Sequence, residues 1–339
     1  MNGMPAAVLR GIRDLVVDER PVPSPGPHEV LVRVTAVGVC GSDVHYYEHG
    51  RIGPYVVDAP LVLGHEPAGV VTAVGAGVTR CHPGLRVSVE PGRPDFTCRQ
   101  CLAGRYNLCP DMRFMATPPV DGAFCEYVVV HEAQAHPVPD AISDDAAALM
   151  EPLSVGIWAC RRGRVTAGSR VLVNGAGPIG LVCVQVAVAC GATEVIVADV
   201  NPYRLDLAKR FGATAVVEVP RMPLAGLDPD VLLECSGHPA ATRAAVEVVA
   251  PAGRAVLVGM GADELPLPLA VLQNRELEVT GTFRYANTWP TAIALVARGR
   301  VDLDGLVTGH FGLSSVEAAL TAGAADPRSV KPVVHPARQ

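Results

Sequence analysis

The chain has 339 residues, of which 49% are hydrophobic, 18% are charged and 4% are aromatic, and its formal net charge is −6. This length predicts two domains of roughly 150 residues each. The charge pattern contains neither a basic field nor a long run of like charges, which argues against a nucleic-acid partner, and the scarcity of aromatic residues argues against base-stacking platforms. No run of eighteen apolar residues predicts a membrane-spanning helix.

The N-terminal segment MNGMPAAVLRGIRDLVV lacks the long apolar core and the cleavage site of a signal peptide. Without such a segment, the ten cysteines favour metal binding or thiol chemistry over disulfides. We therefore expect a cytoplasmic protein with no membrane partner.

Short strands separated by turns are expected before residue 151. Residues 30–37 (VLVRVTAV) form a nearly continuous strand pattern, and residues 70–74, 86–90 and 123–130 show others. The segments PVPSPGP, EPGRP and TPPVDG supply proline and glycine turn signals between them. This pattern predicts an all-β unit, closed or sandwiched.

Strands and helices alternate from residue 151 onward. Residues 152–161 predict a helix with Pro152 at an early helical position. The next expected elements are the strands VLVNG, EVIVAD, AVVEV, VLLECS and AVLVGM, with helices over 178–190, 204–211 and 240–249. This alternation predicts βαβ units and a parallel sheet that is covered on both faces.

The alternation ends after Gly281. Helices are expected over residues 290–297 and 315–322, and SVKPVVHP reads as a closing strand. We expect this tail to return to the first domain. The predicted domains are a β-rich one over residues 1–154 and 288–339 and a parallel-sheet one over residues 155–287.

The segment VLVNGAGPIGL carries a dinucleotide-binding pattern between a strand and a helix. Gly175, Gly177 and Gly180 have G-x-G-x-x-G spacing, which permits a tight turn, a close backbone approach to a pyrophosphate and close helix packing. Asp199 ends the next strand, where a carboxylate can bond the ribose hydroxyls and repel a 2′-phosphate. The pattern therefore predicts NAD rather than NADP. Arg204 is the counter-signal, because it can hold a phosphate, although it can equally lie on a solvated helix face.

Four residues from three separate segments offer the ligand types of a catalytic zinc site. Cys40, His65, Glu66 and Glu151 supply a thiolate, an imidazole and two carboxylates. Catalytic zinc takes three protein ligands and keeps one position open. Each residue alone is weak evidence, because a single cysteine is usually a small packing residue.

A second group of ligands lies in the polar loop PDFTCRQCLAGRYNLC. Asp95, Cys98, Cys101 and Cys109 have a spacing that can wrap one tetrahedral ion. The alternative is three unligated thiols, because the first position is not cysteine. We predict a structural zinc at this loop.

These residues together resemble the zinc-dependent medium-chain alcohol dehydrogenase superfamily. Residues 64–78 fit its zinc signature, G-H-E-x2-G-x5-G-x2-V, at every fixed position. The segments CGSDVHYYEHGRIG, GRYNLCP, ATPPVDG, EPLSVGIWACRRG and FRYANTWP resemble the sorbitol (L-iditol 2-) dehydrogenase branch. The resemblance covers about residues 38–332. It implies a fold of class α/β plus β, in which a β-rich GroES-like zinc-binding catalytic domain is joined to a Rossmann domain with a doubly wound parallel sheet.

The resemblance also implies roles for individual residues. Cys40 and His65 would ligate the catalytic zinc, and Glu66 or Glu151 would complete the shell, directly or through water. Because adjacent residues of an extended chain point opposite ways, His65 and Glu66 can both face the ion only if the chain turns there. The implied substrate residues are Ser42, Tyr46, Phe114, Thr117, Glu151, Arg284 and Tyr285. The implied cofactor residues, besides the three glycines, are Pro178, Ile179, Asp199, Arg204, Val258, Gly259, Met260, Thr282, Phe283 and Arg284.

The implied activity is the reversible oxidation of a secondary hydroxyl of a polyol such as sorbitol, xylitol or iditol to a ketose, with hydride transfer to NAD. The zinc would lower the pKa of the substrate hydroxyl, and Ser42 and His45 are candidates for passing the proton out. His45 can equally be a structural or surface histidine. The implied assembly is a homo-oligomer, either a tetramer or a dimer.

Two alternatives and two departures from the family accompany this interpretation. The alternatives are a threonine-type or simple secondary-alcohol dehydrogenase, and a non-catalytic nucleotide-binding member, which would need no zinc site. Asp95 stands where the family usually has cysteine. Residues 220–229 are short for a crossover, so we expect no helix there.

Overall fold

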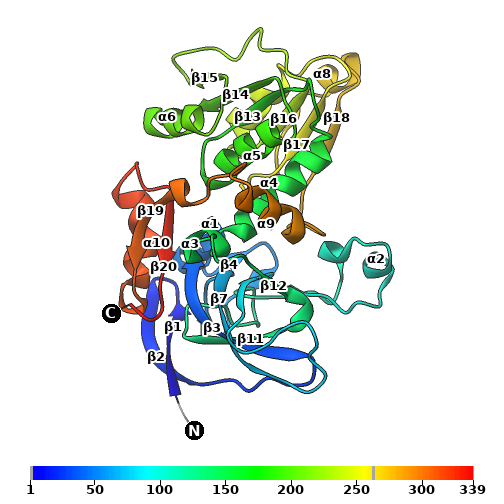
Figure 1. Cartoon of the computed structure of the whole chain (residues 1–339). Coiled ribbons are helices and arrows are strands. Elements are labelled where there is room, and N and C mark those ends of the chain that lie inside the picture. The colour runs from blue at the N-terminus through cyan, green and yellow to red at the C-terminus, as the bar shows by residue number, and fades with distance from the viewer. Residues whose placement is uncertain (1–2, 262–263, 339) are drawn as a thin grey trace. The chain divides into compact units, whose positions relative to one another are not determined.

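The computed structural model describes residues 3–261 and 264–338. The chain forms two compact units (Figure 1). The β-rich unit comprises residues 1–151, 289–297 and 303–339, and the parallel-sheet unit comprises residues 152–288 and 298–302. Within the described residues, no helix is both long enough and apolar enough to cross a bilayer.

The β-rich unit is built mainly from short strands. Its strands are β1 Gly3–Gly11, β2 Asp14–Pro21, β3 Glu29–Gly38, β4 Arg51–Ile52, β5 Tyr55–Val56, β6 Leu61–Val62, β7 Glu66–Val74, β8 Arg86–Val89, β9 Gly92–Arg93, β10 Arg113–Phe114, β11 Tyr127–His131, β12 Ala135–Pro137, β19 Val307–Phe311 and β20 Lys331–Val334. Its helices are α1 Gly41–His49, α2 Arg99–Leu102, α3 Asp144–Ala148, α9 Trp289–Ala297 and α10 Val316–Ala325, with single 3-10 turns at Tyr106–Leu108, Glu132–Gln134, Asp304–Leu306 and Leu313–Ser315.

The main sheet of this unit has the strand order β12-β8-β7-β3-β20-β19, and β11 also pairs with β3. A smaller sheet has the order β2-β1-β6. Strand β3 buries every second residue at its start, including Val30, Val32 and Val34, because alternate side chains of a strand point to the same face. Strand β20 pairs antiparallel with β3, with Val333 opposite Gly38, so the end of the chain completes the main sheet.

The strand expected over residues 123–130 begins only at Tyr127, and this part of the prediction is wrong. Residues 123–125 run across the segment before β7 instead: the amides of Ala123 and Phe124 donate to Gly64 O and Leu63 O at 2.7 and 2.9 Å. The apolar segment is continuous in sequence, but its first half forms backbone hydrogen bonds with residues 63–64 and its second half pairs with β3. The two halves therefore belong to different parts of the unit, and only the second half is a strand of the main sheet.

The parallel-sheet unit contains one six-stranded sheet. Its strands are β13 Arg170–Asn174, β14 Glu194–Asp199, β15 Ala215–Glu218, β16 Val231–Glu234, β17 Arg254–Leu257 and β18 Glu278–Gly281, and its helices are α4 Met150–Gly163, which begins in the β-rich unit, α5 Pro178–Ala189, α6 Pro202–Arg210, α7 Pro239–Val246 and α8 Leu269–Asn274. The order is β15-β14-β13-β16-β17-β18, and every neighbouring pair is parallel. This is the doubly wound order of a Rossmann sheet, which confirms the predicted fold class.

The crossover between β15 and β16 spans residues 219–230 and holds no helix, as its shortness predicts. Strands β13, β14 and β16 are almost wholly buried, because helices cover both faces of the sheet. The carboxyl ends of these strands therefore offer the main exposed edge at which a ligand can meet the sheet.

Candidate functional site

Three predicted zinc ligands meet in the β-rich unit. The ligand atoms of Cys40, His65 and Glu66 all lie within 4.8 Å of one another. Cys40 precedes α1, and Glu66 is the first residue of β7. Gly64, with φ +88°, turns the chain immediately before His65, and the His65 and Glu66 side chains reach one point although the two residues are adjacent. A side chain at Gly64 would also collide with the Phe124 ring at 2.8 Å, which makes the turn specific to glycine.

Asp43 holds this turn in place, and sequence reasoning missed it. Its buried carboxylate accepts bonds from the amides of Cys40 and Gly64 at 3.0 and 2.9 Å, and its Oδ1 lies 3.5 Å from His65 Nδ1. Burial raises the pKa of Asp43, but the charge of His65 and these hydrogen bonds outweigh it and lower the pKa below its usual range. Because Nδ1 faces Asp43, His65 keeps Nε2 available for a metal. The sequence does contain a signal for Asp43: an acidic residue at the third position of a helix commonly accepts a hydrogen bond from the amide of the N-cap residue, which here is Cys40.

Lys331 is the second residue that sequence reasoning missed. Its ammonium lies 2.7 Å from Oε1 and 2.6 Å from Oε2 of Glu66, and it donates to Val39 O at 2.7 Å. Lys331 and Glu66 are only 2% and 1% exposed. Burial lowers the pKa of Lys331, but Glu66 and other nearby acidic groups raise it above its usual value. The signal was a lysine inside the apolar strand pattern SVKPVVHP, because a fully buried lysine is rare unless it is paired.

The cluster fits a catalytic zinc by its donor chemistry. It offers one thiol, one imidazole and one carboxylate, which is a full set of three protein ligands. Glu66 Oε2 is buried and makes no hydrogen bond of normal geometry, so it has a lone pair to give to a metal. Gly38 makes room for this oxygen, since a Cβ there would lie 2.0 Å from it. Glu151 is buried at the start of α4 but does not belong to the group within 4.8 Å, so the geometry favours Glu66 as the direct ligand.

The other predicted residues of the β-rich unit differ in how far they are buried. Tyr46 is buried in α1, and the Phe114 ring lies 5.7 Å from the His65 ring. Ser42 and Thr117 are half-buried. His45 is exposed, and the centre of its ring lies 4.6 Å from that of His49.

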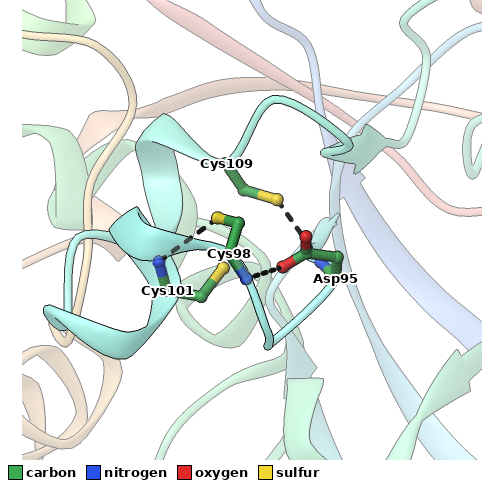
Figure 2. A group of neighbouring side chains, drawn as sticks. All are labelled: Asp95, Cys98, Cys101 and Cys109. Atoms are coloured by element: carbon green, nitrogen blue, oxygen red, sulfur yellow. Dashed lines mark hydrogen bonds between the residues drawn. The ribbon is translucent and has the colours of Figure 1, made fainter.

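The predicted ligands of the second zinc also converge. The ligand atoms of Asp95, Cys98, Cys101 and Cys109 all lie within 4.8 Å of one another, around the short helix α2 (Figure 2). The Asp95 carboxylate accepts bonds from the amides of Thr97 and Cys98 at 2.8 and 2.9 Å, and these bonds lower its pKa to about 2. Burial, followed by hydrogen bonding to its neighbours, raises the pKa of Cys101 to about 12. A thiol in this setting becomes a thiolate only with a cation beside it, as a metal provides.

The loop around this group buries little apolar surface. Leu102, Phe96 and Leu108 are 77%, 47% and 45% exposed. The Tyr106 hydroxyl connects this loop to Glu90, to which it donates a hydrogen bond of 2.7 Å. Three thiols and one carboxylate supply the four ligands of a tetrahedral shell. A structural zinc ion therefore fits here, and its bonds would stabilise a loop that has little apolar core of its own.

The glycine motif of the parallel-sheet unit has the geometry that a pyrophosphate requires. Gly175 has φ +97°, and a Cβ on Gly180 would lie 1.8 Å from Gly175 O. A Cβ on Gly177 would meet nothing within 4 Å, so this N-cap of α5 is open to a ligand. Pro178 and Ile179 begin α5 beside it and are half-buried.

Asp199 lies beside the glycine motif. Its carboxylate accepts bonds from the amides of Ala176 and Asn201 at 2.6 and 2.7 Å. The Arg204 side chain is half-buried, and its buried Nε makes no hydrogen bond within the described residues, so it is not a fully solvated surface group. The two residues that are predicted to distinguish NAD from NADP therefore lie at the end of β14 and in the first turn of α6.

The remaining predicted cofactor residues follow β17 and β18. The amides of Val258 and Gly259 donate to Glu234 O at 2.8 and 2.9 Å. Met260 and Phe283 are exposed. The further predicted residues of this segment are Thr282, bonded to Leu257 O, Arg284, whose guanidinium lies 4.8 Å from the Phe283 ring centre, and the buried Tyr285.

Glu234 is a third residue that sequence reasoning missed. Its buried carboxylate accepts bonds from the Asn174 side chain and from the amides of Ser236 and Gly237, at 3.2, 3.0 and 3.2 Å. A Cβ on Gly175 would lie 2.8 Å from Ser236 N, so Glu234 fixes the loop that borders the glycine motif.

Comparison with known proteins agrees with both units. Residues 26–140 match the alcohol dehydrogenase GroES-like domain, and residues 178–298 match the zinc-binding dehydrogenase family. The chain is 46% identical to sorbitol dehydrogenase of Gallus gallus, over 94% of this chain and 91% of that protein. It is 42% identical to sorbitol dehydrogenase of Bacillus subtilis, over 94% and 93%.

Solved structures show the same fold. L-idonate 5-dehydrogenase from Escherichia coli has a TM-score of 0.93 at 32% identity, with 98% of each chain covered. Galactitol-1-phosphate dehydrogenase from Escherichia coli has a TM-score of 0.90 at 31% identity, with 98% of this chain and 100% of that chain covered.

Proposed function

Because the chain belongs to the zinc-dependent medium-chain alcohol dehydrogenase family, we propose that it oxidises a secondary hydroxyl of a polyol to a ketone, reversibly, with hydride transfer to NAD. The observation that carries this proposal is the convergence of Cys40, His65 and Glu66 on one point. A non-catalytic member of the family would have no need of such a cluster. The similarity to sorbitol dehydrogenases over almost the whole chain supports a polyol as the substrate class.

Each residue of the cluster has a separate task in this proposal. Cys40, His65 and Glu66 hold the catalytic zinc, and Glu151 contributes through a water molecule. Zinc bound there supplies Lewis acidity that lowers the pKa of a substrate hydroxyl. Asp43 orients the His65 ring, and Lys331 orients the Glu66 carboxylate. Ser42 is then placed to pass the hydroxyl proton outward, with the exposed His45 as the next acceptor.

The substrate assignment follows the family resemblance. Tyr46, Phe114, Thr117 and Glu151 would contact the polyol, together with Arg284 and Tyr285. A site that hydrogen-bonds several hydroxyls discriminates against simple alcohols, because the buried polar groups would be left without partners. We therefore expect polyols to be preferred over isopropanol.

A panel of polyols tests this function. The zinc-loaded protein should reduce NAD with sorbitol, xylitol, galactitol or a related polyol, measured by NADH absorbance. Threonine and isopropanol serve as comparison substrates for the alternative dehydrogenase activities. Turnover of threonine or isopropanol above every polyol would reject the substrate class, and no turnover of any of them by zinc-loaded protein would favour a nucleotide-binding protein without catalysis.

Asp199 is proposed to select NAD. Its carboxylate would bond the ribose hydroxyls and repel a 2′-phosphate. The Asp199→Ala variant should therefore lose much of the preference for NAD over NADP. Its kcat/KM should fall for NAD, which loses the hydrogen bonds to its ribose, and rise for NADP, whose 2′-phosphate is no longer repelled. The ratio of the two kcat/KM values measures this.

Arg204→Ala is the matched control for the Asp199 prediction. It should leave the preference for NAD intact if Arg204 holds no phosphate. A wild-type enzyme that prefers NADP, together with loss of that preference in Arg204→Ala, would contradict the role of Asp199 and assign cofactor selection to Arg204.

A structural zinc is proposed at Asp95, Cys98, Cys101 and Cys109. The exposed apolar side chains of this loop support the need for a metal. The Cys101→Ser variant should bind one zinc ion fewer per chain and lose thermal stability, while Cys40 and His65 still hold their ion. Elemental analysis of metal-replete protein checks this prediction. Unchanged zinc content in Cys101→Ser would leave the three cysteines as free thiols.

A cytoplasmic homo-oligomer, either a tetramer or a dimer, completes the proposal. The ten cysteines all lie within the described residues and none forms a disulfide, which suits a reducing compartment. Light scattering of the purified protein would give the number of chains in the assembly.

A further inference from the structure

A third group of ligand-type side chains lies in the β-rich unit, apart from the two groups that contain cysteine. Asp145 lies in α3, His310 lies in β19, and His335 directly follows β20. Their ligand atoms all lie within 4.8 Å of one another. His310 Nε2 is 2.6 Å from Asp145 Oδ2, and His335 Nε2 is 3.0 Å from Asp145 Oδ1. Three distant chain segments therefore bring two imidazoles to the two oxygens of one carboxylate.

The contacts of His335 indicate which of its ring nitrogens carries a proton. His335 Nδ1 lies 2.9 Å from Thr35 O. Because a carbonyl oxygen can only accept, Nδ1 must carry a proton, and Nε2 of the neutral ring then presents a lone pair to Asp145 Oδ1. That oxygen is buried and makes no hydrogen bond of normal geometry. In the neutral ring two acceptors therefore face each other at 3.0 Å. The contact with Asp145 raises the pKa of His335, so a proton on Nε2 satisfies both atoms at low pH, and a metal ion between them can take the place of that proton.

The backbone around His335 also resembles the support of a metal ligand. A histidine that binds a metal usually donates its other ring N–H to a carbonyl or carboxylate, which fixes the ring. Thr35 O provides that acceptor, and the His335 amide donates to Phe311 O at 2.8 Å. His335 is therefore held to β3 on one side and to β19, which carries His310, on the other.

A surface cavity of about 680 Å³ gives this group access to solvent. It is lined by Arg33, Thr35, His310, His335, Ala337 and Arg338. The His310 side chain is 43% exposed, so an ion can reach the group and keep a water or an anion as a further ligand. The two arginines are exposed, and water screens their repulsion of a cation.

We propose that Asp145, His310 and His335 form a third metal site, which binds a divalent ion of the zinc class through two imidazoles and one carboxylate. Such a set suits zinc and its neighbours and leaves one position open. In a tetrahedral shell with zinc–ligand bonds of about 2.0–2.1 Å, ligand atoms lie about 3.3 Å apart. The two imidazole nitrogens lie 2.6 and 3.0 Å from the oxygens of Asp145, so each needs to move away by less than about 1 Å. The bound ion would connect α3, β19 and the segment after β20, and so stabilise the last strand of the chain.

Zinc counting in matched variants tests the site. Wild-type protein, His310→Ala and Asp145→Asn are stripped with a chelator and titrated with Zn²⁺ against a chromophoric competitor. His82→Ala is the control, because His82 is an exposed histidine of the same unit outside all three groups. Wild type and control should bind one zinc ion per chain more than the two variants. The difference does not depend on how many ions the cysteine-containing sites take, so it is separate from the test of the proposed activity.

Two further measurements show where the additional ion binds. Co²⁺ at this site has no sulfur ligand, so the extra equivalent in wild type should add d–d absorption without thiolate charge-transfer bands. Zinc should also raise the melting temperature of wild type and control more than that of the variants, whatever the melting temperature without metal. Equal zinc counts in all four proteins, or an extra ion that binds only at millimolar zinc, would overturn the proposal.

Discussion

His65→Ala should remove the catalytic metal and reduce kcat/KM for a polyol by at least about a thousandfold. Loss of one of only three protein ligands opens the shell, and Lewis-acid stabilisation contributes several kcal/mol, of which about 4 kcal/mol corresponds to a factor of a thousand. The measurements are zinc content and the rate of NADH formation. Binding of NADH should persist, because the residues proposed to bind it lie in the parallel-sheet unit.

The His82→Ala variant is the control for this result, and it should keep both zinc and activity. Asp43→Asn should have an effect between those of His65→Ala and His82→Ala. It keeps the shape of the side chain but weakens its bond to His65, so a loss of about 10–100-fold in metal affinity is expected. Full turnover by His65→Ala, or by a zinc-free wild-type preparation, would show that the cluster is not the catalytic centre.

Lys331→Met should destabilise the zinc-free β-rich unit by about 3–5 kcal/mol, because it leaves the buried Glu66 carboxylate without its partner. The side chain of methionine fills much of the same space, so the loss is mainly electrostatic. The chain has two tryptophans, Trp158 and Trp289. In a Trp158→Phe background, the fluorescence of Trp289, which is buried and donates to Ser88 of the β-rich unit, reports the denaturant unfolding of that unit.

Two comparisons isolate the charge effect of Lys331. The double variant Glu66→Gln/Lys331→Met removes both charges, and it should recover most of the stability lost in the single variant. Zinc should also reduce the loss of unfolding free energy in Lys331→Met, since an ion bound to Glu66 replaces the missing positive charge. A single variant as stable as wild type would show that the ion pair has no such role.

Local patterns in the amino-acid sequence are sufficient to predict the fold class and the types of ligand side chain that the chain offers. The alternation of apolar strands and helices from residue 170 predicts the parallel sheet, because a strand covered on both faces must be apolar throughout. The spacing of Gly175, Gly177 and Gly180 predicts the phosphate turn, because only glycine leaves the space that the turn requires. The spacing of Cys98, Cys101 and Cys109 likewise predicts that the three sulfurs can meet. These signals are local, and local geometry is largely fixed by nearby residues.

The contacts between side chains that are distant in sequence depend on the tertiary structure. Lys331 lies 265 residues from Glu66 in the chain, and it reaches that carboxylate only because β20 pairs with β3 beside β7. The same pairing brings His335 to Thr35 and, with α3 and β19, to Asp145 and His310. No periodicity or spacing encodes these contacts, because the free energy that forms them comes from closing the sheet and burying its core. Charges and imidazoles placed on its strands then acquire partners that depend on strand order and register.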